Sequence, residues 1–129
     1  MRVGEHRNVF AVSSPESLYD SIPYPTFPQP EVHPDRLAAI ATLYGVTPPS
    51  LDRCRILEIG CGDGRNLLSM AWVMPGAEVV GVDLSASAIE RGRDMARQIG
   101  PPNLDLRQGA LENIDNSWGK FDFILAQGV

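Results

Sequence analysis

Apolar residues follow a regular alternation of patterns from residue 54 onward. Short apolar runs of strand length alternate there with segments whose apolar residues recur every three or four positions. Four runs predict strands: 54–59, 78–82, 104–108 and 121–126. Two segments predict helices: 66–74 and 86–99. Strands that alternate with helices form a parallel sheet with helices on its faces, so the predicted fold class is α/β.

The first 33 residues show a different pattern and predict an extended, proline-rich arm. Eight of the eleven prolines lie in the first 50 residues, and the segment 21–30 holds four of them. Proline removes an amide donor and fixes φ, which excludes a helix or a central strand there. Two interpretations remain open: a flexible leader, or a strap that Tyr24 and Phe27 pin over a groove.

A leading helix is predicted directly after the arm, where we place the start of the domain that covers residues 34–129. Pro34 suits the first helical position, and Gly45 suits a left-handed C-terminal cap. Four apolar residues between them recur at helical spacing and predict a packing surface: Leu37, Ile40, Ala41 and Tyr44.

Length and charge restrict the class of protein. A chain of 129 residues suits one domain, and its net charge of −5 argues against bulk attraction to nucleic acid or to an anionic membrane. No apolar run is long enough to span a bilayer, and the N-terminus lacks a secretory signal. Cys54 and Cys61 are too few for a disulfide scaffold and are not spaced as a metal site. We therefore expect a cytoplasmic protein without a metal ion or a membrane partner.

The candidate chemistry lies where the predicted strands end. Residues 60–64 form a glycine-rich turn between the first strand and its helix, which lets a ligand approach the backbone and predicts amides that point at it. Asp83 ends the second strand, where a doubly wound sheet places an acid for ribose hydroxyls. Because the carboxyl ends of parallel strands share one edge, residues 127–128 belong there too. The combination predicts a nucleoside-containing cofactor.

The details of the turn favour S-adenosylmethionine over a dinucleotide. Its glycines, Gly60, Gly62 and Gly64, are spaced two and two, whereas dinucleotide folds space the second and third glycines by three. Glu58 places a negative charge two residues before the first glycine. Such a charge suits a cationic ammonium or sulfonium and opposes an anionic pyrophosphate. An NAD-dependent oxidoreductase remains the less favoured alternative.

These residues resemble those of class I S-adenosylmethionine-dependent methyltransferases. The resemblance rests on Glu58 with the three glycines and on the segment 80–85. Segments 19–25, 33–37 and 121–129 are similar to a bacterial subgroup whose methyltransferase domain precedes a methyltransferase regulatory domain. The resemblance covers residues 18–129 and implies a Rossmann-like doubly wound sheet, of which this chain supplies four of seven strands, in the order 3-2-1-4.

The resemblance implies roles for the residues of the first two strand ends. Gly60 and Gly62 would pass the methionine portion of the cofactor, and Glu58 would orient its ammonium. Asp83 would accept hydrogen bonds from the ribose hydroxyls. Cys61 belongs to the same cofactor-binding turn, and we expect its side chain to be a small buried filler and no nucleophile.

The resemblance implies further contacts at the later strand ends. Leu84 would pack on the adenine face, with Ala110 and Leu111 beside the adenine edge. Many family members have aspartate at the position of Ala110, so a backbone amide would replace that side chain here. Gln127 and Gly128 would line the methionine side near the reactive methyl group.

Three other polar residues near these motifs are expected to be structural. We expect Asp63 to cap the helix after the turn, Asp122 to support the fourth strand, and His33 to precede or cap the leading helix.

The activity implied is transfer of a methyl group to an unidentified acceptor, a protein side chain or a small molecule, with S-adenosylhomocysteine as the product. Tyr24 of the arm would close over the cofactor, and no catalytic residue is predicted. Because the sequence ends after the fourth strand, we expect an N-terminal fragment that is inactive alone. The alternative is a non-catalytic module that binds cofactor or a partner. The fourth strand would be an unpaired apolar edge, so we also expect self-association.

Overall fold

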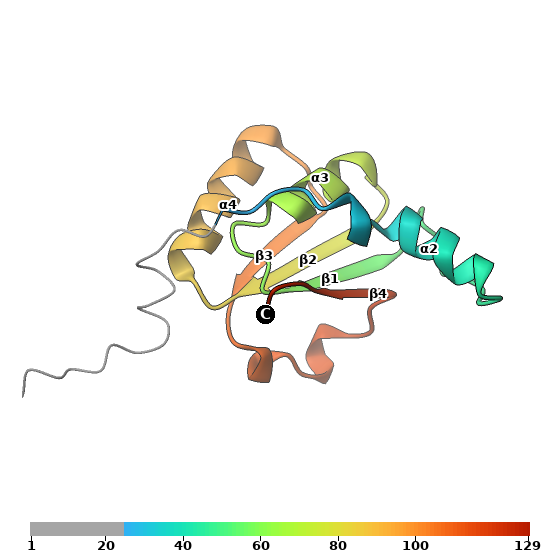
Figure 1. Ribbon diagram of the computed structural model, residues 1–129. Helices are drawn as coiled ribbons and strands as arrows, with labels where there is room; N and C mark the ends of the chain where they lie inside the picture. Colours follow the sequence, from blue (N-terminus) through green and yellow to red (C-terminus); the bar gives the residue numbers. More distant parts are fainter. Residues whose placement is uncertain (1–24) are drawn as a thin grey trace, which may run out of the picture.

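The computed structural model describes residues 25–129 (Figure 1). Tyr24 lies outside the described residues. The strands are β1 (Arg55–Ile59), β2 (Glu78–Asp83), β3 (Leu104–Gln108) and β4 (Phe123–Ala126). The α-helices are α2 (Pro34–Leu43), α3 (Arg65–Val73) and α4 (Ala86–Ile99). Short 3-10 turns are η1 (Pro30–Val32), η2 (Leu111–Asn113) and η3 (Asn116–Trp118).

The four strands form one parallel sheet in the order β3-β2-β1-β4, which confirms the predicted topology. The chain adds strands in one direction from β1 to β3 and then returns to place β4 on the other side of β1. Sheets of this kind bind ligands outside the carboxyl ends of their strands, where the strand order reverses. That point lies between β1 and β4 here.

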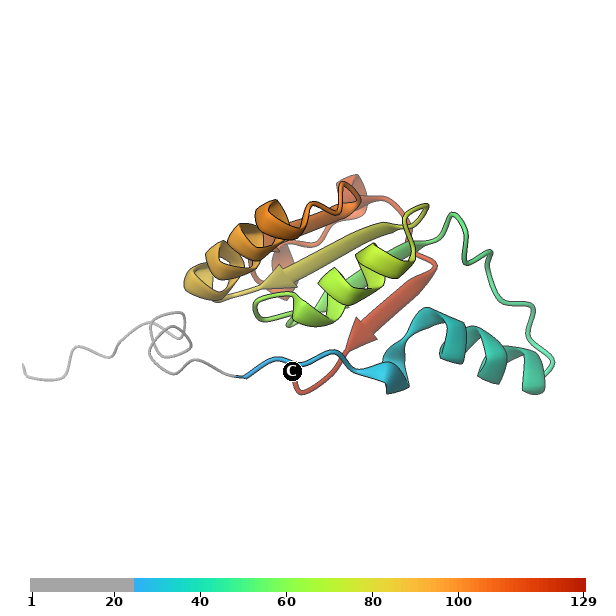
Figure 2. The same ribbon diagram turned by 90° about the horizontal axis from the view of Figure 1, so that it is seen from above.

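The two faces of the sheet are covered differently. Helices α3 and α4 lie on the same face, because the β1–β2 and β2–β3 crossovers run in the same direction (Figures 1 and 2). The core on this face includes Ile56, Val79, Leu106, Met70 and Ile89. The opposite face is covered by the segment that holds η2 and η3. Its smaller cluster is Leu57, Val80 and Val82 with Ile59, Ile114, Trp118 and Phe121.

Local sequence signals account for the helix ends. The Ser85 hydroxyl accepts the Ala88 amide at 3.1 Å and caps α4, which ends at Gly100 with a φ of 85°. His33 caps α2, since its Nδ1 accepts the amide of Asp35 at 3.4 Å. The structural role predicted for His33 is confirmed.

Helix α2 corrects one prediction of the sequence pattern. Leu37 packs against the core, as predicted, but Ile40 and Tyr44 are 42% and 84% exposed. The buried residues of this helix are Pro34 and Ala38. The helix meets the rest of the molecule through its first turns and projects from it beyond them (Figure 1). Of the predicted packing surface, Leu37 contacts the core, whereas the two buried residues of the helix lie outside the predicted set.

The described residues contain neither a candidate membrane span nor a candidate metal site. Across residues 25–129, no helix combines the length and apolar character that crossing a membrane requires. The same residues hold no group of three or more His, Cys, Asp or Glu side chains placed to bind a metal ion.

Candidate cofactor-binding site

The glycine-rich turn joins β1 to α3 at the carboxyl edge of the sheet. Gly60, Gly62 and Gly64 have φ values of 70°, 58° and 71°. This left-handed region is open to glycine and strained for residues with a Cβ. The three glycines are therefore required by the backbone path itself.

The backbone amides of the turn are engaged within the protein. Those of Gly60 and Cys61 both donate to the carbonyl of Val82, at 2.8 and 3.1 Å. That of Gly62 donates to Asp83 Oδ2 at 2.7 Å. The expectation that the turn offers free amides to a ligand is wrong for these three groups, because β2 lies close enough to accept them. These three amides are therefore not free to bind the pyrophosphate of a dinucleotide.

Asp63 neutralises the start of α3 and is buried. Its Oδ1 accepts the amide of Arg65 at 3.4 Å, and its Oδ2 lies 3.2 Å from Arg65 Nε. Gly64 is the formal N-cap and has no side chain for this purpose. Asp63 therefore lies one residue before the N-cap, where it accepts an amide of the first turn and pairs with Arg65, so its role is structural as expected although it is not the N-cap itself.

Asp83 is held rigidly at the end of β2. Its Oδ2 accepts the amide of Gly62 at 2.7 Å and its Oδ1 accepts the amide of Ser85 at 2.8 Å. Each carboxylate oxygen accepts more than one hydrogen bond, so acceptor capacity remains on both. This arrangement presents a half-buried, fixed acceptor pair, which suits two neighbouring hydroxyl groups.

Glu58 is the buried carboxyl group of the site. It is 5% exposed, and its Oε1 accepts a hydrogen bond from Asn66 Nδ2 at 2.9 Å. Its Oε2 is buried without a hydrogen-bond partner among the described residues. Burial raises the pKa of Glu58 to about 7, although the Asn66 bond acts in the opposite direction. A buried, half-satisfied carboxyl group is unfavourable unless a cation or donor completes it.

The pKa of the Cys61 thiol depends on its burial and on the charged groups around the turn. The thiol is buried, and its pKa is raised first by burial and then by the carboxylates of Asp83, Glu58 and Asp63. A thiol with a raised pKa is a poor nucleophile, which agrees with the expected role as a buried filler. Three carboxyl groups therefore lie near the turn, and Arg65 offsets the charge of one of them, Asp63.

The end of β4 reaches the same edge. The pairing of Ile59 with Ala126 places residues 127–128 beside the turn, as predicted, and both are exposed. The side chain of Val129 lies against Gly60, where an added Cβ would come 2.2 Å from Val129 Cγ1. The absence of a side chain at Gly60 therefore allows the segment after β4 to approach closely.

The residues predicted for the adenine region follow β2 and β3. Leu84 is half-buried, and its carbonyl accepts Gln108 Nε2 at 3.2 Å. The amide of Ala110 donates to Asn113 Oδ1 at 2.7 Å. Asn113 therefore already occupies the amide of Ala110, and a backbone amide that replaces the missing aspartate would have to be another one. Leu111 begins η2 and is 60% exposed.

The arm lies against the turn. An added Cβ on Gly62 would come 2.5 Å from Thr26 Cγ2, and the Thr26 hydroxyl donates to Asp63 Oδ1. Phe27, predicted as an aromatic anchor, is 64% exposed. That prediction is wrong, because a short polar side chain holds the arm in its place. The described part of the arm therefore contacts the turn, but not through Phe27 as the strap interpretation expected.

A second contact of the arm involves a residue that the sequence analysis missed. The amide of Gln29 donates to Asn66 Oδ1 at 2.8 Å. Asn66 is 5% exposed in the first turn of α3 and also contacts Glu58. The available signal was an asparagine directly before the apolar pair 67–68, a polar group that must find buried partners if the helix packs there.

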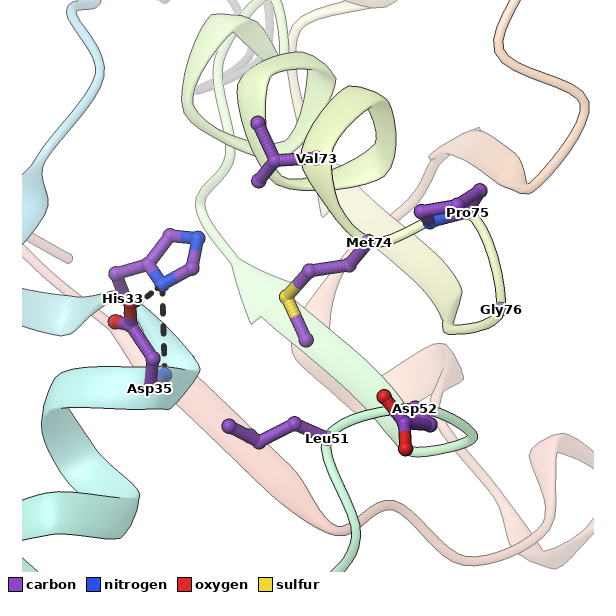
Figure 3. Close-up of a pocket in the computed structure, with 8 residues that line it drawn as sticks. All are labelled: His33, Asp35, Leu51, Asp52, Val73, Met74, Pro75 and Gly76. Atoms are coloured by element: carbon purple, nitrogen blue, oxygen red, sulfur yellow. Dashed lines mark hydrogen bonds and ion pairs between the residues drawn. The ribbon is translucent and has the colours of Figure 1, made fainter.

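A cavity of about 370 Å3 lies elsewhere, at the amino ends of the strands (Figure 3). Met74 points into it between His33 and Leu51, and Asp52 and Gly76 form its rim. None of the predicted cofactor-binding residues lines it. Its lining joins the start of α2 to the loops before β1 and β2, and we interpret it as a packing seam.

The chain resembles known methyltransferases in sequence and structure. A family model for a methyltransferase domain matches residues 50–129. The uncharacterized protein RP789 of Rickettsia prowazekii (strain Madrid E) is 39% identical over 111 residues, 86% of this chain and 20% of that protein. A ubiquinone biosynthesis O-methyltransferase of Azorhizobium caulinodans is 40% identical over 75 residues, 58% of this chain and 28% of that enzyme.

The structure of PKMT2 from Rickettsia typhi in complex with AdoHcy matches with a TM-score of 0.80 at 39% identity. The match covers 83% of this chain and 21% of PKMT2. The chain thus spans about a fifth of the length of PKMT2 and of RP789. Together with the strand order and the glycine turn, the family match identifies this chain as a member of the methyltransferase domain family.

Proposed function

We propose that residues 25–129 form the S-adenosylmethionine-binding part of a methyltransferase. The observation that carries the proposal is the buried carboxyl group of Glu58, whose Oε2 has no hydrogen-bond partner within the described part of the chain. An ammonium group supplies both the charge and the donor that this oxygen needs. The structure of PKMT2 with AdoHcy supports the same ligand class.

The residues of the site fit the parts of this cofactor. Glu58 would hold the ammonium of the methionine portion, and Asp83 would accept the ribose hydroxyls. Leu84 and Leu111 would flank the adenine, and residues 127–128 would line the methionine side. The cofactor supplies a methyl group activated by a positively charged sulfur, so the protein has mainly to position donor and acceptor.

The acceptor of the methyl group belongs to the same proposal. We infer a protein side chain or a small molecule, and we assign the whole protein to the subgroup in which a regulatory domain follows the methyltransferase domain. The similarity of segments 33–37 and 121–129 to that subgroup supports the assignment.

Calorimetric titration of this chain with S-adenosylhomocysteine and, separately, with NAD tests the cofactor. We expect saturable binding of S-adenosylhomocysteine and none of NAD, because the turn offers carboxylates and no free amides at Gly60, Cys61 and Gly62. Binding of NAD, or failure of the folded chain to bind S-adenosylhomocysteine, would contradict the proposal.

Methyl transfer is tested separately with S-adenosylmethionine that carries a labelled methyl group, mixed with cell-extract proteins or with the small molecules of the same extract. Label in either fraction identifies the acceptor class. Binding without transfer to either fraction would favour the non-catalytic module.

A further inference from the structure

Asn66 connects the arm to the carboxyl group of Glu58. Its Nδ2 donates to Glu58 Oε1 at 2.9 Å, and its Oδ1 accepts the amide of Gln29 at 2.8 Å. Both Asn66 and Glu58 are 5% exposed. The link therefore runs through the interior, from the backbone of the arm to the acid of the candidate site.

The chemistry of this link requires a side-chain amide. A carboxamide carries a donor and an acceptor on one planar group, whereas a carboxylate only accepts and an ammonium only donates. The Nδ2 group of Asn66 donates to the carboxyl group of Glu58, and the Oδ1 of Asn66 accepts from the amide of Gln29. Only one orientation of Asn66 satisfies both partners, so the group is fixed at both ends.

We propose that Asn66 is a positioning residue that couples docking of the arm, residues 25–33, to the orientation of Glu58 and so to the ammonium end of the cofactor. The inference rests on the proposed function, because it assigns the free oxygen of Glu58 to that ammonium. Asn66 holds Oε1, and the proposal assigns to the ligand the other oxygen, Oε2, which is buried without a hydrogen-bond partner among the described residues.

The coupling works in both directions. A hydrogen bond to an ionised carboxylate is shorter and stronger than one to a neutral carboxyl group. An ammonium bound at Oε2 keeps Glu58 ionised, so it strengthens the bond from Asn66 and restrains the group that holds the arm. A ligand without an ammonium does not have this effect.

A separate contact of the arm supplies a control. The Thr26 hydroxyl donates to Asp63 Oδ1, and its methyl group lies over Gly62. Thr26→Val removes the hydroxyl and keeps the shape, which loosens the arm without touching Asn66 or Glu58. This variant therefore weakens arm docking while the hydrogen bond between Asn66 and Glu58 stays in place.

The test combines hydrogen exchange of residues 25–33 with calorimetric titration of two ligands, S-adenosylhomocysteine and methylthioadenosine, which lacks the amino acid portion. In the wild-type chain we expect S-adenosylhomocysteine to slow exchange of the arm and methylthioadenosine to leave it unchanged. In Asn66→Ala we expect faster exchange of the ligand-free arm and an affinity for S-adenosylhomocysteine reduced about tenfold or more. The affinity for methylthioadenosine should change less than about twofold.

Asn66→Asp provides an isosteric second variant if the alanine variant does not fold. In its ionised form this side chain keeps the acceptor for Gln29 and has no donor for Glu58, so we expect an arm protected as in the wild type and a weakened affinity for S-adenosylhomocysteine. Thr26→Val should show faster arm exchange with a smaller loss of affinity than Asn66→Ala.

Two results would overturn the inference. Equal loss of affinity for both ligands in folded Asn66 variants would mean that Asn66 has a merely structural role. Unchanged hydrogen exchange of the arm in Asn66→Ala would mean that Asn66 does not connect the arm to Glu58. If the folded wild-type chain bound neither ligand, the proposed function would fail and the inference with it. Exchange of the ligand-free arm would still show separately whether Asn66 holds it.

Discussion

Two glutamates on neighbouring strands show how differently the two ends of the sheet are built. Glu78 begins β2 at the amino end, where Arg55 holds it with two hydrogen bonds of 2.7 and 2.8 Å and lowers its pKa. Glu58 lies near the carboxyl end of β1, where burial raises its pKa to about 7. Among residues 25–129, the protein provides a cation for the first and none for the second.

We interpret the amino end of the sheet as structural and the carboxyl end as functional. At the amino end, Arg55 also donates to the carbonyls of Trp118 and Lys120, at 3.1 and 2.6 Å, and lies over the ring of Phe121. At this end, the protein itself therefore supplies the partners of Glu78 and Arg55. At the carboxyl end, the protein retains a buried acid that destabilises the fold when it is ionised. Such a feature is typical of a site whose partner is a ligand.

The largest effect is expected for Asp83→Ala. The backbone amides of Gly62 and Ser85 lose their charged acceptor. In the proposed complex, the ribose hydroxyls of the cofactor lose the same acceptor. The free energy of unfolding should fall by roughly 3 kcal/mol, and the affinity for S-adenosylhomocysteine at least about a hundredfold. Chemical denaturation and calorimetry measure the two. Asp105→Ala, on the exposed part of β3, is the matched control and should retain binding; an Asp83→Ala chain that binds normally would remove Asp83 from the site.

The next effect concerns the pH dependence of stability. The pKa of Glu58 is about 7 in the folded chain against an ordinary value of 4.5, so the folded state holds this proton more tightly. Its stabilising contribution is present below pH 4.5 and is lost as the pH rises through about 7, a fall on the order of 3 kcal/mol. Glu58→Gln should abolish this fall, as measured by denaturation across that range.

Glu78→Gln is the control for the opposite end of the sheet. The pKa of Glu78 is lowered, so its contribution is present above its ordinary value of 4.5 and is lost as the pH falls through its lower folded pKa. The decline between pH 4.5 and 7 should therefore persist in this variant. Its disappearance would mean that Glu58 is not the group responsible.

A smaller effect is expected for Arg55→Ala, which removes contacts only at the amino end of the sheet. Loss of its bonds to Glu78, Trp118 and Lys120 should lower the free energy of unfolding by about 1–2 kcal/mol. Affinity of the folded chain for S-adenosylhomocysteine should stay within about twofold of the wild type. Arg36→Ala changes an exposed arginine of α2 and should alter neither quantity. A large loss of affinity in Arg55→Ala would show that the two ends are not independent.

The smallest effect on stability is expected at the edge of the sheet. Among the described residues β4 pairs with β1 alone, and Ile124 is 62% exposed. We propose that this edge mediates self-association. Ile124→Lys should shift the chain toward monomer in sedimentation while changing the free energy of unfolding by less than about 0.5 kcal/mol. Ile99→Lys, at the end of α4, should leave self-association unchanged. Equal shifts toward monomer in both variants would mean that exposed apolar residues in general, and not β4, cause the self-association.

The sheet and the turn could be predicted because their signals are local. Apolar runs bounded by glycine fix the strands, and Gly60, Gly62 and Gly64 occupy positions that require a left-handed backbone. The order 3-2-1-4 came from the resemblance to a family and was confirmed. Periodicity could not predict how far α2 is covered, because Tyr44 is part of its apolar face whether or not another element lies against it.

The contacts that complete the site could not be predicted, because they join distant segments. Asn66 meets Glu58 across 8 residues of sequence and Gln29 across 37, and no repeat marks either separation. The turn amides are engaged by Val82 and Asp83, whose proximity depends on the pairing of β1 with β2. Local rules therefore place the acids at one edge and leave their partners undetermined.

Proton release on ligand binding tests the central claim most directly. At about pH 6, one unit below its pKa of about 7, Glu58 is mostly protonated in the free chain, and an ammonium bound at Oε2 must ionise it. Calorimetric titration with S-adenosylhomocysteine in buffers of different ionisation enthalpy should show release of nearly one proton per site, and none in Glu58→Gln. Binding at that pH without proton release would contradict the assignment of Glu58 to the ammonium group.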